Sequence, residues 1–141
     1  MDNYVTYSNG EVGEVEKVYA IAVTDNTTLT ANDSGKIILV GTDAKTITLP
    51  PSKAGLTFTF VNIGAAGNNI LKVSPVSTEG ISGTITLASS VVVLDGTVNK
   101  AAINTKATSV SGDSLTILGT GLAGSKAWVV TASTGIWARE A

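Results

Sequence analysis

Apolar and polar residues alternate in short runs along most of the chain. The clearest run, LTFTFVNI at residues 56–63, places its leucine and both phenylalanines of the protein on one face and its threonines on the other. This period of two is typical of a half-buried strand, so we expect this strand at the centre of the core. KTITL at residues 45–49 alternates in the same way and predicts that Ile47 and Leu49 point inward.

Two further runs are apolar without interruption. KIILV at 36–40 and SVVVLDG at 90–96 predict strands that are buried on both faces. The segment 97–112 is compatible with an irregular strand pair or with one short helix. Shorter strand candidates lie at 18–23, 70–74, 84–88, 113–118, 126–132 and 135–140.

Turn residues separate these runs, and no stretch keeps a helical period. The turns recur at roughly 8–12 residues, a spacing typical of sandwiches and barrels. Residues 18–141 are therefore predicted to form one all-β domain, an antiparallel sandwich or barrel of short strands. Five aspartates lie beside glycine, asparagine, serine or threonine, where Asp is favoured for local hydrogen bonding. They are Asp25, Asp33, Asp43, Asp95 and Asp113.

Residues 1–17 differ from the rest of the chain. They are acidic, with no Lys or Arg before Lys17, and their apolar residues are isolated. This pattern predicts an extended N-terminal arm that orders on a partner; a frayed terminus or a first edge strand is the alternative. The candidate binding residues of the arm are Tyr4, Val5, Tyr7, Glu11, Glu14 and Glu16.

Composition narrows the classes of function. Charged residues make up 14% of the chain, against roughly 25% in soluble domains. This indicates either an assembly component with covered surfaces or a β surface that is polar without charge. No basic stripe is present, which disfavours nucleic-acid binding. No apolar run approaches the ~20 residues of a membrane span, and no signal-peptide pattern is present, so we expect synthesis in a cytoplasm and no membrane partner.

Candidate chemistry is sparse. The chain has no Cys and no His, which excludes thiolate sites and removes the side chain best suited to acid–base work near neutral pH. GTGLAG at 119–124 matches a dinucleotide-binding pattern, but a β-type run follows it instead of a helix, so we expect a hairpin loop. The aspartates are interpreted as turn residues and not as a hydrolytic pair or calcium site. We therefore expect no enzyme, no metal, no cofactor and no small-molecule substrate.

The two tryptophans lie near the C-terminus. Trp128, within AWVV, is predicted to be a core residue. Trp137 is open to two interpretations: a core residue, or an interface aromatic or sugar-stacking platform.

A resemblance covers residues 29–83. DSGK in a turn, then ITLP, AGLTFTFV and GISG, resemble a module of tailed-bacteriophage virion proteins. The module is similar to parts of head decoration (capsid cement) proteins and of tail fibre or spike proteins. The acidic arm has no counterpart in that pattern.

The resemblance implies a structural role in the virion. The short chain, which has no long fibrous repeat, favours a decoration protein that binds the major capsid protein on the outer capsid surface and stabilises the shell by bridging capsomers. The resemblance also implies that the protein is a homotrimer and that it is made in the host cytoplasm. A tail fibre or adaptor protein is the first alternative. A carbohydrate-binding β module that stacks sugars on Trp137 or on tyrosine residues is the second.

Overall fold

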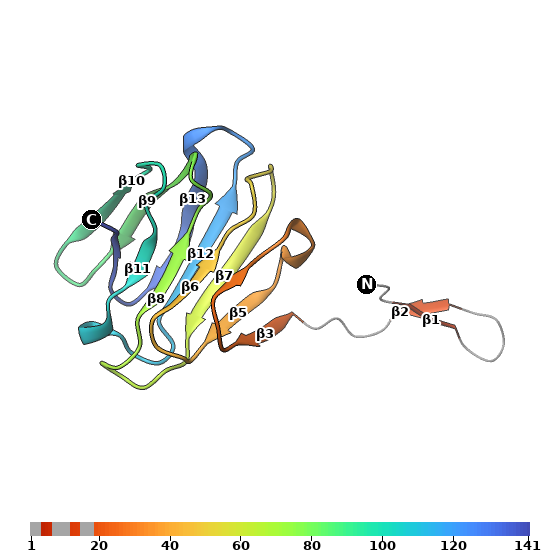
Figure 1. Cartoon of the computed structure of the whole chain (residues 1–141), viewed down its shortest axis with the longest axis horizontal. Coiled ribbons are helices and arrows are strands. Elements are labelled where there is room, and N and C mark those ends of the chain that lie inside the picture. The colour runs from red at the N-terminus through yellow and green to blue at the C-terminus, as the bar shows by residue number, and fades with distance from the viewer. Residues whose placement is uncertain (1–3, 7–11, 15–18) are drawn as a thin grey trace.

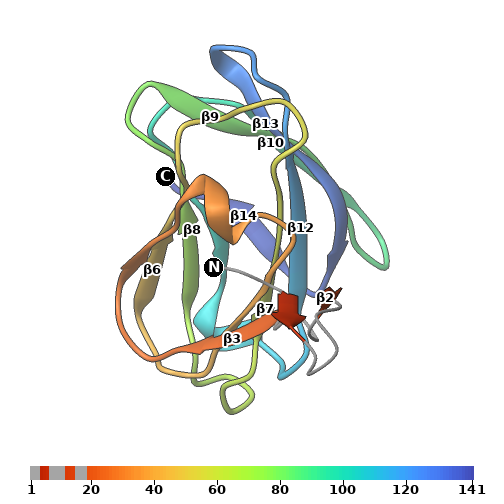
Figure 2. The same cartoon turned by 90° about the vertical axis from the view of Figure 1, so that its right-hand side faces the viewer.

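The computed structural model describes residues 4–6, 12–14 and 19–141. Strands β1 (Tyr4–Thr6) and β2 (Val12–Glu14) pair antiparallel as a separate two-stranded sheet (Figure 1). The other strands form two sheets that face each other in two layers (Figure 2). Two short 3-10 turns, η1 (Ala31–Asp33) and η2 (Lys106–Thr108), are the helical elements of the described residues.

One layer is a seven-stranded sheet and the other has five strands. In spatial order the first contains β10 (Val91–Asp95), β9 (Glu79–Thr86), β13 (Gly124–Thr134), β12 (Ser114–Gly119), β7 (Thr57–Asn62), β5 (Ile37–Val40) and β3 (Ala20–Val23). The second contains β14 (Trp137–Arg139), β11 (Ala102–Asn104), β8 (Leu71–Ser74), β6 (Lys45–Thr48) and β4 (Thr27–Thr28).

The chain winds between the two sheets from β3 to β8. Successive strands alternate between layers, so β3, β5 and β7 pair parallel in one sheet while β4, β6 and β8 pair parallel in the other. The later strands β11, β12, β13 and β14 add antiparallel pairs to this wound unit. The predicted all-β sandwich is confirmed, but its sheets are mixed. The alternation of side chains predicts which face of a strand is buried, whereas it carries no information on which strand lies beside it.

The core lies between the two layers and is built mainly from aliphatic side chains with four large aromatic ones. β7 is central, between β12 and β5, and the phenylalanines of this strand are buried as predicted. Ile47 and Leu49 are also fully buried, as predicted. The largest fully buried side chains are Trp128, Trp137, Phe58, Phe60, Ile38, Ile47, Leu49, Leu71, Ile85, Leu115, Ile117 and Val40.

The prediction of two strands buried on both faces is wrong for one strand and holds only in part for the other. In β10, Val91 is 57% exposed and Val93 is 63% exposed, because both lie on the outer face of the seven-stranded sheet, which no other sheet of the described residues covers. In β5, Ile37 is exposed and Leu39 half-buried, while the alternate residues are buried. The segment 97–112 contains a short strand and a 3-10 turn instead of a strand pair or an α-helix.

Candidate interaction surface

The predicted arm residues divide into two groups. Tyr4 and Val5 lie in β1 and Glu14 lies in β2, where the antiparallel register places Tyr4 opposite Glu14. Tyr7, Glu11 and Glu16 lie outside the described residues. The boundary between arm and domain at residues 17 and 18 also lies outside them.

Trp137 is not an exposed interface aromatic. Its side chain is fully buried, and its Nε1 donates a hydrogen bond to the Thr134 carbonyl oxygen at 3.0 Å. It lies opposite the buried Asn104 on the inward row of the five-stranded sheet. A ring in this position offers no surface on which a sugar could stack, so the carbohydrate-binding interpretation that used Trp137 is wrong.

Trp128 is a core residue, as predicted. Its ring centroid lies 5.9 Å from that of Phe58. Its indole Nε1 donates to Glu79 Oε2 at 3.1 Å, and the same carboxylate accepts the Ser52 backbone N–H. The indole therefore has its one polar group satisfied inside the fold.

The GTGLAG pattern forms the loop between β12 and β13, a hairpin connection as predicted. Its glycines have structural reasons. A Cβ at Gly119 would lie 2.5 Å from the Lys53 carbonyl oxygen, and Gly121 has φ of +77° while its backbone approaches Ala54. The loop is tightly packed against residues 52–54, and this contact explains the glycines without a phosphate.

Four of the five predicted turn aspartates accept a backbone N–H from a residue within three positions, as expected for local hydrogen bonding, whereas Asp43 accepts from the distant Ile70. Asp33 completes a capping box with Thr30, whose backbone N–H lies 2.9 Å from Asp33 Oδ2, and this bond lowers the pKa of Asp33. The corresponding donors to Asp25, Asp43, Asp95 and Asp113 are the backbone N–H groups of Asn26, Ile70, Thr97 and Val110. Within the described part of the chain, His, Cys, Asp and Glu side chains form no group of three or more that could hold a metal.

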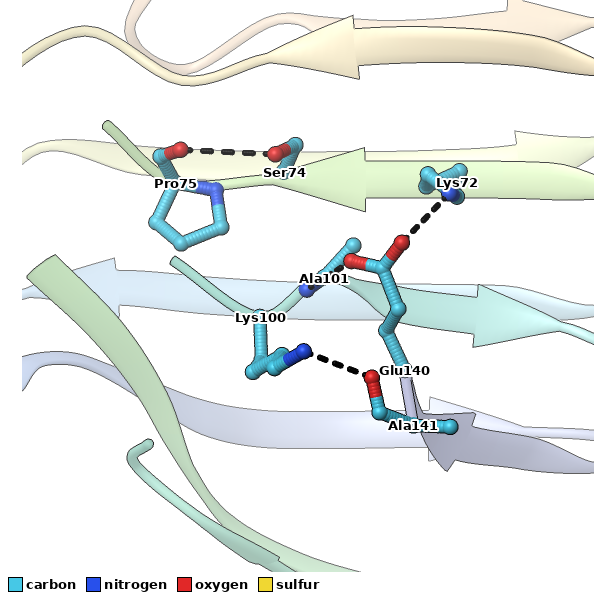
Figure 3. Close-up of polar contacts among 7 residues, drawn as sticks. All are labelled: Lys72, Ser74, Pro75, Lys100, Ala101, Glu140 and Ala141. Atoms are coloured by element: carbon cyan, nitrogen blue, oxygen red, sulfur yellow. Dashed lines mark hydrogen bonds and ion pairs between the residues drawn. The ribbon is translucent and has the colours of Figure 1, made fainter. Parts of the chain in front are cut away.

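A charged cluster lies on the outer side of the five-stranded sheet (Figure 3). Glu140 Oε1 accepts from Lys72 Nζ at 2.7 Å, and Glu140 Oε2 accepts from the Ala101 backbone N–H at 3.2 Å. These two bonds hold the pKa of Glu140 below its ordinary value of 4.5, the Lys72 hydrogen bond being the larger cause. Lys100 Nζ donates to the Ala141 oxygen at 2.6 Å, and Ser74 Oγ donates to the Pro75 carbonyl at 3.3 Å. This face is therefore marked by paired charges.

The outer face of the seven-stranded sheet is different. Directly paired residues point to the same side of a sheet, so the registers define one outward row from each strand. We call these rows the uncharged face: Ala20, Ala22, Ile37, Leu39, Thr57, Thr59, Val61, Ser114, Thr116, Leu118, Val129, Ala132, Thr134, Ser82, Thr84, Thr86, Val91 and Val93.

Charge reaches this side of the molecule only at its margin among the described outward rows. Asp95, at the end of β10, pairs through its Oδ1 with Arg139 Nε at 3.4 Å and so connects edge strands of the two sheets. The uncharged face was not predicted from the sequence. The signal was present in the low charged fraction of 14% and in the T-x-T runs, but locating the face needs the strand order.

Comparison of the chain with models of known protein families and with curated proteins gives no match. Across residues 4–6, 12–14 and 19–141, no helix combines the length and apolar character that a membrane crossing requires. The function is therefore inferred from the surfaces of the protein and from the resemblance of residues 29–83.

Proposed function

We propose that this protein is a structural component of a bacteriophage virion that binds the outer surface of the capsid and stabilises it by bridging capsomers. The observation that carries the proposal is the uncharged face, which covers one side of a seven-stranded sheet and supports a component of an assembly, in which copies of this chain or other proteins cover the face. Extended apolar surfaces of soluble proteins commonly mark sites of contact with other proteins. The resemblance of residues 29–83 to phage decoration proteins supports the same role.

The mechanism is binding without chemistry. A protein that binds the assembled shell, but not its separated parts, stabilises the shell by mass action. Each contact can be modest because many copies, each a homotrimer, act on one particle. The major capsid protein is the proposed partner, and neither a cofactor nor a substrate takes part. The protein would be made in the host cytoplasm and then join the virion.

The N-terminal arm is proposed to contact the capsid. Its apolar residues Tyr4, Val5 and Tyr7 would act as anchors, and its glutamates would face basic residues of the lattice. Opposite charges across an interface speed association and select the partner. The β1–β2 pairing supports this role, because it gives the arm strands of its own outside the two large sheets.

The test uses shells assembled without the decoration protein. Deletion of residues 1–16 should abolish co-sedimentation with these shells, while circular dichroism still reports a folded β domain. A triple variant, Glu11→Gln, Glu14→Gln and Glu16→Gln, should weaken binding and reduce its salt dependence. Asp25→Asn, which removes one exposed carboxylate from a turn of the β domain, is the matched control and should bind normally.

Two results would contradict the proposal. One is normal decoration of shells by the truncated protein, which would exclude the arm as the contact. The other is an image of the virion in which the protein lies only on the tail, at a copy number far below that of the capsid subunit. That second result would favour the tail fibre or adaptor alternative.

A further inference from the structure

Six of the eight hydroxyl groups of the uncharged face are already bonded within the sheet, and the other two, of Thr84 and Thr86, lie exposed beside β10. Thr57 Oγ1 donates to the Ile117 carbonyl at 3.1 Å, and the Thr59 and Thr116 hydroxyls bond to each other at 2.9 Å. Covering a polar group is costly chiefly when its hydrogen bonds with water are lost without replacement. These hydroxyls keep their partners when the face is covered. The same holds for three more hydroxyls. Ser82 Oγ donates to the Trp128 carbonyl, the Ser114 and Thr134 hydroxyls bond to each other, and Thr134 Oγ1 also donates to the Gly112 carbonyl.

Apolar side chains gather on the β3 side of this face. The parallel registers place Leu39 of β5 between Ala22 of β3 and Val61 of β7. Ile37, two residues earlier on the same outward row, is 37% exposed. Alanines on the neighbouring strand leave room for a second layer to approach these larger side chains. Apolar area that can be removed from water without breaking hydrogen bonds favours association.

The size of the face matches that of a stable protein contact. Its rows extend across all seven strands, from Ala20 of β3 to Val93 of β10. They offer close to the roughly 20–30 residues that each partner contributes to an interface of standard size. Two sheets that pack face to face lie about 10 Å apart with interdigitating side chains.

We propose that the uncharged face is the contact between copies of this chain. Where copies of one chain meet around a symmetry axis through the same face, a charged residue near the axis would lie close to its own copies. Among the outward rows of the described strands, charge occurs only at Asp95, which pairs with Ser82 at the end of the edge strand β10 and is bonded to Arg139, far from the centre of the face. A partner with a charged surface would find no residues of opposite charge across this face, whereas a second copy brings no charges that need a partner.

The opposite side of the molecule carries charges and is therefore less suited to be buried in this contact. The outer side of the five-stranded sheet carries the ion pair of Lys72 and Glu140, whose burial would require desolvation of both charges. The inference rests on the proposed function only in assigning a surface to the homotrimer. Self-association can be measured on the purified protein without capsids.

The test is sedimentation velocity of the full-length protein, without shells, across about 1–100 μM. The wild type should sediment as an oligomer. Val61→Lys places a charge among the apolar side chains on the β3 side of the face and should weaken self-association about 100-fold or more. Ile37→Lys, at a more exposed position of the same face, should act in the same direction and guards against a folding defect at Val61.

Ile103→Lys is the matched control. Ile103 is a half-buried β-branched residue on a central strand, as Val61 is, but it lies on the outer side of the five-stranded sheet. This variant should keep the wild-type sedimentation coefficient, with circular dichroism confirming the fold of all three variants. A monomeric wild type, or an oligomer that both face variants leave intact, would overturn the inference. An oligomer that forms but does not bind shells would contradict the proposed function alone.

Discussion

Asn104 Nδ2 donates a hydrogen bond to Asp113 Oδ2 at 3.0 Å, and both side chains are buried. The bond joins β11 of the five-stranded sheet to the turn that precedes β12 of the seven-stranded sheet. Asn104 Oδ1 also accepts from Asn62 Nδ2 of β7 at 2.6 Å, and Asn104 Nδ2 donates to the Ile136 carbonyl at 3.0 Å. Asn104 therefore links the two sheets by hydrogen bonds at the end of the core where the loops begin.

Replacing this asparagine should be costly. Asn104→Leu removes every one of these bonds and leaves the Asp113 carboxylate and the Asn62 amide short of partners in a buried site. We expect the free energy of unfolding to fall by about 2–4 kcal/mol, since each unsatisfied buried polar group costs about 1–3 kcal/mol. Urea denaturation measures the change. Asn68→Ala, at an exposed asparagine, should stay within about 0.5 kcal/mol of wild type, and an equal loss in both variants would contradict the role of the network.

The inward faces of the strands could be predicted from the sequence wherever alternation was regular. The run 56–63 is the best case, because its threonines and phenylalanines differ strongly in the free energy of burial. The run 90–96 failed for a physical reason. A run that is apolar on both faces is typical of a strand covered on both sides, but the outer face of β10 has no layer over it, and only the arrangement of the sheets shows this.

The candidate surface was less accessible to sequence reasoning. Trp137 was ambiguous because an indole serves equally well in a core and at an interface. The uncharged face brings together residues as distant as Ala22, Val61 and Thr116, and no local pattern predicts that these share one side. The local hydrogen bonds of Asp25, Asp33, Asp95 and Asp113 could be predicted, in contrast, because their donors are neighbours in the chain, whereas the bond from Ile70 to Asp43 could not.

The stability of the fold should depend on the ionised state of Glu140. The hydrogen bonds from Lys72 and Ala101 lower the pKa of this carboxyl in the folded state. A depressed pKa means that the stabilisation is present above the ordinary value of 4.5 and is lost as the pH falls through the folded-state pKa. Glu140→Gln should therefore lower the free energy of unfolding by about 1 kcal/mol at pH 7, after allowing for solvent screening.

Chemical denaturation at pH 7 and pH 3 measures this effect. The difference between wild type and Glu140→Gln should shrink at pH 3, because the wild-type carboxyl is then increasingly protonated. Lys72→Met should reduce the difference at pH 7, since it removes the larger cause of the pKa shift. A difference that is independent of pH would show that the substitution acts through packing and not through charge.

The burial of Trp137 predicts a structural phenotype. Trp137→Ala should lower the free energy of unfolding by about 3–5 kcal/mol, because it opens a large cavity and removes the hydrogen bond to Thr134. Ile136→Ala changes the neighbouring side chain, which is 39% exposed, and should cost less than about 1.5 kcal/mol. Thermal and urea unfolding compare the two variants. A stable Trp137→Ala protein would contradict the placement of this ring in the core.

The structural explanation of the GTGLAG loop can be tested at its first glycine. In Gly119→Ala the new Cβ would lie 2.5 Å from the Lys53 carbonyl oxygen and 3.3 Å from Trp128 Cζ3, so backbone must move. We expect a loss of about 1–3 kcal/mol, the range for overpacking a tight site. Leu122→Ala, in the same loop at a side chain that is 55% exposed, should stay within about 0.5 kcal/mol of wild type. If the glycines instead served a nucleotide, Gly119→Ala would leave unfolding unchanged, and ATP or NAD would raise the melting temperature of the wild type but not of the variant.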